Sequence, residues 1–223
     1  MIGIIVWKEL KEIIRDKSTL SSIFSILLFL TLLNMTTLKH NIIFNVESLV
    51  FYMTPCLGII VGFGLSTRLI REKQEGVIET LLCTPITLRE LWLGKIIGLT
   101  IPSCSIALIS ILTLIHIKGL SLNEVIIAYL IIVAPAIITS IIGILGLLYY
   151  ILGMKQVQMV NYAVFFSIFT TLHLVVEKLT IPSTSIMSWW NLSIILAISL
   201  GILGIAFHLT SHLSKERIVT SIN

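Results

Sequence analysis

The segment Val125-IIAYLIIVAPAIITSIIGILGLLYYILG-Met154 runs for 30 residues without a charged side chain. A helix that crosses the hydrocarbon layer of a membrane needs roughly 20 mainly apolar residues, because each residue rises about 1.5 Å across a layer of about 30 Å. The segment is therefore longer than a straight transmembrane helix requires. It also contains Pro135, Gly143, Gly146 and Gly153, so we expect this span to be tilted, kinked or broken at those positions.

Five further windows, each long enough to cross a membrane, share this absence of charge. The composition agrees, since 57% of the 223 residues are hydrophobic, 12% are charged and the mean hydropathy is +1.07. That is more apolar surface than a soluble fold of this size buries. We therefore predict an all-α integral membrane protein, a single domain over residues 1–223 with six transmembrane helices, at about 21–38, 48–67, 96–117, 125–154, 156–176 and 190–213.

The distribution of cations predicts the orientation of these spans. Lys and Arg in short loops near the ends of spans are retained on the cytoplasmic side. With both termini cytoplasmic, 12 of the 15 cations lie inside, and only Lys39, Lys118 and Lys178 lie outside. We therefore predict a multi-pass protein of the plasma membrane. The net charge of +4 indicates topology and contact with anionic lipid, and no nucleic-acid partner is expected.

The first 17 residues form a different kind of segment, in which apolar and charged positions alternate at helical spacing. The apolar positions are Val6, Leu10, Ile13 and Ile14, and the charged positions opposite them are Lys8, Lys11, Glu12 and Arg15. Such a segment is too charged to span a membrane. We predict an amphipathic helix over residues 1–17 that lies along the cytoplasmic interface, where it contacts lipid through Trp7, Lys8, Lys11 and Arg15. An ordinary surface helix is the alternative, but the sequence shows no soluble domain to carry it.

Residues 68–95 form the longest hydrophilic stretch between spans, and we predict that they are a cytoplasmic loop. Within it, residues 76–83 favour a short helix with Val77 and Leu81 on one face, Ile78 and Leu82 beside them, and Glu75 and Glu79 one turn apart. Pro85 ends that helix. Thr87 followed three residues later by Glu90 is a capping box, which predicts a second helix that runs through Trp92 and Lys95 into the third span.

This loop resembles the signature of ABC-2 type permeases, the membrane-spanning subunits of one class of ABC transporter. The matching positions are Glu72, Gly76, Glu79, Leu81, Pro85, Gly94 and Lys95. The resemblance implies a permease that pairs with a second copy or a homologous permease and with ABC ATPase subunits. It also implies that the first cytoplasmic loop supplies a coupling helix to the ATPase, with Glu72, Glu75, Gly76, Glu79, Leu81, Leu82 and Pro85 as the coupling residues. The other interpretation of the loop is a solvated connector.

The resemblance implies a non-catalytic transport subunit of an exporter. The sequence contains no Gly-x-x-x-x-Gly-Lys-Ser/Thr loop, so ATP hydrolysis is expected in a partner. The membrane subunit of the haem exporter for cytochrome c maturation is an alternative within the same family. A membrane-embedded enzyme or a non-transporting scaffold are alternatives of other classes, although no pair of carboxylates or nucleophile and base is assembled at membrane depth.

No cofactor and no metal site is expected from the sequence. His208 and His212 lie four residues apart, close enough on a helix to share a metal ion, but no carboxylate or cysteine accompanies them at helical spacing. They are therefore interpreted as polar residues at the membrane interface. The remaining histidines are distributed over three loops, and the cysteines have no metal-binding spacing.

Overall fold

Every regular element in the described part of the chain is a helix, which confirms the all-α prediction there. The computed structural model describes residues 2–16, 21, 46–77, 86–118, 122–153, 156–164, 166–167, 170 and 187–212. The elements are α1 (Ile2–Arg15), α3 (Val46–Gln74), α5 (Leu88–Lys118), α6 (Glu124–Ala128), the π-helical turn η1 (Tyr129–Val133), α7 (Ala134–Ile151) and α9 (Trp189–His212). Residues 156–164 are helical as well.

Four of these helical stretches are long and apolar enough to cross a membrane, as expected of a membrane protein. They are Val50–Gln74, Leu88–His116, Glu124–Ile151 and Trp189–His212. They coincide with the second, third, fourth and sixth predicted spans. The first predicted span lies outside the described residues except for residue 21, and the fifth is described only at 156–164, 166–167 and 170.

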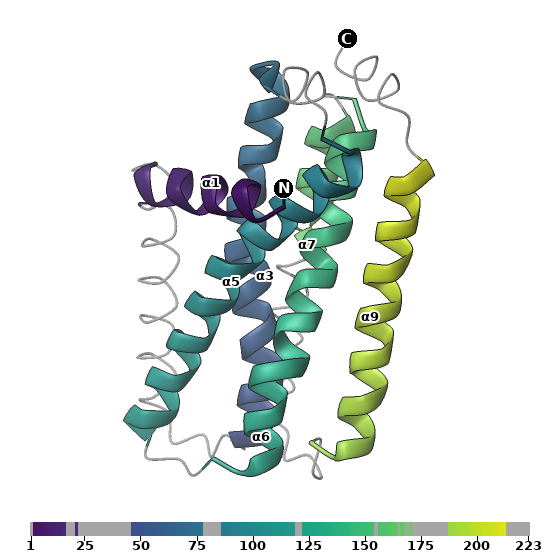
Figure 1. Cartoon of the computed structure of the whole chain (residues 1–223). Helices are drawn as coiled ribbons and strands as arrows, with labels where there is room; N and C mark the ends of the chain where they lie inside the picture. Colours follow the sequence, from purple (N-terminus) through teal and green to yellow (C-terminus); the bar gives the residue numbers. More distant parts are fainter. Residues whose placement is uncertain are drawn as a thin grey trace.

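The four long helices run side by side, with α7 in contact with each of the other three, while α1 lies across α5 (Figure 1). The contact between α3 and α7 depends on two glycines one turn apart. A Cβ atom added at Gly58 would come within 2.2 Å of Ile138, and one added at Gly62 within 2.5 Å of Ile142. Small residues at this spacing let two membrane helices approach closely.

The fourth span is distorted near its proline, as predicted, and its helix ends at Ile151, two residues before Gly153. Pro135 offers no N–H group to the carbonyl four residues earlier and crowds it, and the chain responds with a π-helical turn at Tyr129–Val133. The expectation of a break at the glycines is wrong for Gly143 and Gly146, which lie inside the continuous helix α7. Their role is packing, since a Cβ atom at Gly146 would come within 2.5 Å of Ile96 in α5.

A second proline, Pro55 in α3, leaves the carbonyl group of Phe51 without its usual helical donor. The Tyr129 hydroxyl donates a hydrogen bond to this carbonyl over 2.6 Å, and the two rings stack with their centroids 5.3 Å apart. Tyr129 is completely buried. In lipid an unpaired carbonyl costs several kcal/mol, so the π-helical turn in one span completes the hydrogen bonding of another.

The change Tyr129→Phe tests this contact, because it removes the hydroxyl and keeps the ring. We expect the free energy of unfolding in detergent to fall by about 1 to 3 kcal/mol, the cost of leaving a buried acceptor unsatisfied. Thermal unfolding followed by circular dichroism measures the change. Tyr162→Phe is the matched control, since Tyr162 is exposed and should tolerate the loss. Equal stability of the two variants would contradict the contact.

Candidate functional site

Helix α1 crosses the start of α5 at two glycines, and this crossing brings three helices together. A Cβ atom added at Gly94 would come within 2.7 Å of Ile5, and one added at Gly98 would come within 2.7 Å of the Cβ atom of Glu9. The two glycines therefore allow α1 to lie almost against the backbone of α5. Because Gly94 directly precedes Lys95, the same close approach carries the face of α1 onto that lysine.

Helix α1 has one apolar edge against the protein and another that faces outward. Of the predicted apolar face, Ile13 is buried and Ile14 is 71% exposed, as is Trp7. The contact of this outer edge with the membrane interface stays a prediction. The residues predicted to meet the membrane interface are all exposed, as that role requires, namely Trp7, Lys8, Lys11 and Arg15.

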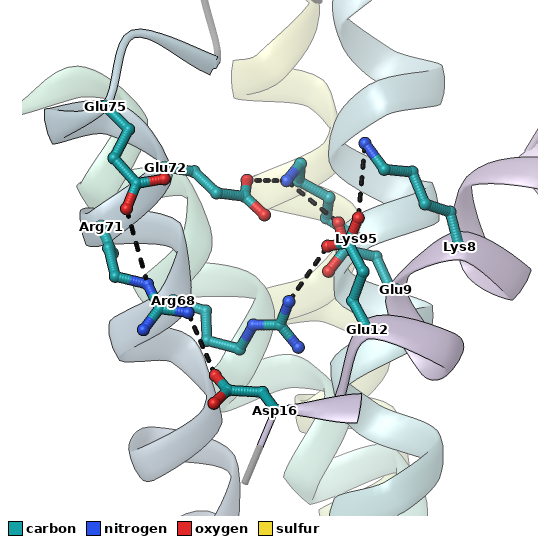
Figure 2. Close-up of polar contacts among 9 residues, drawn as sticks. All are labelled: Lys8, Glu9, Glu12, Asp16, Arg68, Arg71, Glu72, Glu75 and Lys95. Atoms are coloured by element: carbon teal, nitrogen blue, oxygen red, sulfur yellow. Dashed lines mark hydrogen bonds and ion pairs between the residues drawn. The ribbon is translucent and has the colours of Figure 1, made fainter. Parts of the chain in front are cut away.

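At the crossing, Lys95 lies between two carboxylates, one from α1 and one from α3 (Figure 2). Its Nζ atom is 3.1 Å from Oε1 of Glu9 and is also hydrogen-bonded to Oε2 of Glu72. The side chains of Lys95 and Glu9 are 1% and 3% exposed, and that of Glu72 is 14% exposed. We call Glu9, Glu72 and Lys95 the ion-pair hub, because these three charges link α1, α3 and α5.

Further ion pairs extend from the hub along α1 and α3 (Figure 2). Glu12 accepts a hydrogen bond from Arg68 over 3.0 Å, and Asp16 accepts one from Arg71 over 3.0 Å. The acidic side chains of α1 thus recur at helical spacing and meet basic side chains of α3. Arg68 is nearly buried and belongs with the hub, whereas the Arg71 pair is half exposed and contributes little to stability.

The electrostatics of the hub depend on burial and on pairing. Burial raises the pKa of the Glu9 carboxyl above its ordinary range, and the neighbouring Lys95 ammonium opposes that rise. Carboxylate oxygens of Glu9, Glu12 and Glu72 lie within 4.8 Å of one another, a spacing that could suit a metal ion. The Lys95 ammonium already pairs with two of the three, so we interpret the group as an ion-pair cluster.

A lysine next to the hub fastens α3 to the end of α7. Lys73 is 1% exposed, and its Nζ atom donates hydrogen bonds to the carbonyl oxygens of Tyr149, Tyr150 and Leu152 over 3.2, 3.4 and 2.6 Å. The last carbonyls of a helix have no partner within the helix, and a cation favours the negative end of its dipole. The end of α3 is therefore held on both sides, by α7 and by the hub.

The predicted loop 68–95 divides into three parts in the structure. Residues 68–74 continue α3, so Glu72 lies on a long helix, and Glu75 follows at its end. Gly76 then adopts a left-handed conformation with φ of 70°, which ends a helix without strain only at glycine. Of the predicted helix 76–83, only Gly76 and Val77 are described; Glu79, Leu81, Leu82 and Pro85 lie outside the described residues.

The third part of the loop begins with the capping box, which the structure confirms. The backbone N–H of Glu90 donates to the Thr87 hydroxyl over 3.3 Å, and the backbone N–H of Thr87 donates to the Glu90 carboxylate over 3.1 Å. Helix α5 begins at Leu88 and runs through Trp92 and Lys95, as predicted. The segment between the two long helices is thus only residues 75–87, and Glu72 and Lys95 stand at its base.

Sequence reasoning missed Glu9, Glu12, Asp16 and Arg68 as members of this cluster. A signal was present, since the three acidic residues lie three and four positions apart, on one side of a helix. They share that side of α1 with Ile13, so the apolar and charged faces of the helix overlap, and the sequence pattern did not single out the acidic residues. The ion pairs join the two helix ends that flank segment 75–87 to each other and to α1.

Comparison with known proteins adds no identification. No family model matches the chain, and neither a curated protein nor a solved structure matches it.

Lys95→Met tests the hub, because methionine keeps the length of the side chain and removes its charge. The change leaves Glu9 and Glu72 buried without a counter-charge, so we expect a loss of about 3 to 5 kcal/mol in the free energy of unfolding. Chemical denaturation in detergent measures it, with Lys11→Met, at an exposed site, as the control. Adding Glu9→Gln and Glu72→Gln should restore most of the loss. No rescue by these changes would contradict the hub.

Gly98→Val tests the crossing of α1 over α5. The added side chain would meet the Cβ atom of Glu9, which no rotation can move away, so we expect α1 to be displaced at a cost of about 1 to 3 kcal/mol. Trypsin should then cleave after Lys8 and Lys11 roughly tenfold faster, as a change of about 1.4 kcal/mol gives. Gly201→Val in α9 is the control, since nothing lies within 4 Å of a Cβ atom there. Equal cleavage of both variants would refute the crossing.

Proposed function

We propose that this chain is the membrane-spanning subunit of an exporter of the ABC-2 type, driven by a separate ATPase subunit. The observation that carries the proposal is the contact of Glu72 with Lys95 at the base of segment 75–87. Both residues belong to the pattern that resembles ABC-2 permeases, and they lie 23 positions apart. This contact offers a physical reason for the occurrence of both residues in the pattern, because their ion pair joins the two helices at the base of segment 75–87.

A permease driven from outside the membrane needs a rigid connection between its docking segment and its spans. Segment 75–87 joins α3 directly to α5, and the ion-pair hub ties these two helices together where the segment leaves them. A push on the segment therefore moves both helices together, and Glu9 transmits the movement to α1. In this proposal Val77, Leu81 and Leu82 meet the ATPase through their apolar side chains, and the acidic residues surround that contact.

The proposal includes the remaining architecture expected from the sequence. The subunit has six spans with both termini cytoplasmic, lies in the plasma membrane and pairs with a second copy or a homologous permease. The clustering of cations supports this orientation, because Arg68, Arg71, Lys73, Arg89 and Lys95 all flank segment 75–87 at one end of the bundle. The chain itself hydrolyses no ATP in this scheme, and the energy enters through segment 75–87.

Co-expression with candidate ABC ATPase subunits tests the proposal. We expect a complex that co-purifies in detergent and shows vanadate-sensitive ATP turnover. Glu79→Ala and Leu82→Ala should each reduce the stimulation of the ATPase roughly tenfold, which corresponds to about 1.4 kcal/mol of coupling, without loss of membrane insertion. The control is Glu124→Ala, at the opposite end of the bundle.

Two outcomes would contradict the proposal. One is recovery of the chain alone, with no effect of nucleotide, from membranes that contain all candidate ATPases. The other is full ATPase stimulation by a variant whose residues 76–83 are replaced by Ala and Ser, since such a segment keeps its length and loses its apolar face.

A further inference from the structure

The last turn of α9 carries two exposed histidines whose ring nitrogens meet. The Nε2 atoms of His208 and His212 are 3.2 Å apart, although the centres of the two rings are 4.8 Å apart. The nitrogen-bearing edges of the rings therefore face each other. The rings are inclined at 73°, so this contact does not come from stacking.

Two interactions can bring ring nitrogens this close: a hydrogen bond between them, or a shared metal ion. Both interactions fit a separation of 3.2 Å between the Nε2 atoms. Both rings are exposed near the end of α9, so an ion from solution can reach the two nitrogens.

The spacing also agrees with metal coordination. A zinc ion binds imidazole nitrogen at about 2.0 to 2.1 Å, and two such ligands at a tetrahedral angle lie about 3.3 Å apart. Histidines four positions apart on a helix lie on the same face and can reach one ion together. The sequence alone did not favour a metal site here, because the spacing of two histidines along a helix does not show which edges of their rings face each other.

We propose that His208 and His212 form a bidentate site for a divalent transition-metal ion, with Zn²⁺ as the representative. Imidazole nitrogen is a ligand for ions of this class and a poor one for Mg²⁺ or Ca²⁺. The neighbouring hydroxyls of Thr210 and Ser211 donate to backbone carbonyls within the helix, at 2.6 and 2.5 Å. Water completes the coordination in this proposal, so the ion exchanges readily.

Binding at this position would stabilise the end of α9 where it meets α5. Phe207, next to the first histidine, lies 6.5 Å from Trp92 between ring centres, and the Arg89 guanidinium lies 5.7 Å above the Phe207 ring. An ion held by residues one turn apart fixes that last helical turn. The metal would thus secure a contact between α9 and the first turns of α5, independently of the transport proposed above.

Zinc titration of the purified full chain tests the site, with a tag that contains no histidine and after treatment with a chelator. We expect saturable binding of Zn²⁺, measured by calorimetry, together with a rise in the thermal unfolding midpoint. His208→Ala and His212→Ala should each weaken the binding at least tenfold. The double variant should bind no more weakly than either single variant, because the chelate requires both rings. His116→Ala, at an exposed histidine on the opposite end of the bundle, is the matched control.

Two results would overturn the proposal. Binding that survives in His208→Ala and His212→Ala would place the metal elsewhere. Absence of saturable Zn²⁺ binding by the unaltered chain, with an unchanged unfolding midpoint, would show a hydrogen-bonded histidine pair only.

Discussion

A lysine ammonium group that water barely reaches must have its charge balanced by neighbours, and this requirement organises one end of the molecule. Lys95 is 1% exposed and is paired with Glu9 and Glu72. Burial of an unpaired charge costs several kcal/mol, so neither carboxylate can be moved away without a large penalty. The position of α1, the extension of α3 beyond its apolar window and the glycines at the start of α5 all follow, because each brings a partner within reach of Lys95.

The hub also explains why α1 is held by contacts with the protein and not by lipid alone. Its outer edge carries Trp7 and Ile14, which suit a lipid boundary, and its inner edge carries Glu9. The inner edge packs closely on α5 at Gly98, where the absence of a side chain lets the backbones of the two helices approach each other. An amphipathic helix held by lipid alone would need no such fit. This helix is instead a structural part of the bundle whose remaining surface faces outward.

Local features of the chain were predictable, and contacts between distant residues were not. Hydrophobic length located the described spans, and Thr87 with Glu90 located the start of α5 to within one residue, because both signals are contained within a few turns. The hub joins residues 86 positions apart, so no spacing rule applies to it. Pro135 predicted a distortion of the fourth span, but its form depended on Tyr129 and on a carbonyl freed by another proline in another helix.

The two ends of the bundle are built from different interactions, and this decides which end can change shape. At the far end the packing is apolar around Tyr129, where a rearrangement would leave polar backbone groups without partners. At the other end, which carries segment 75–87, an exposed ion pair has an alternative partner. Arg71, which is half exposed, lies near both Asp16 and Glu75. Exposed ion pairs exchange at little cost, whereas the buried hub does not. Segment 75–87 is therefore attached to a part of the fold where a buried ion-pair hub is surrounded by exchangeable contacts, which is the arrangement that the proposed coupling role needs.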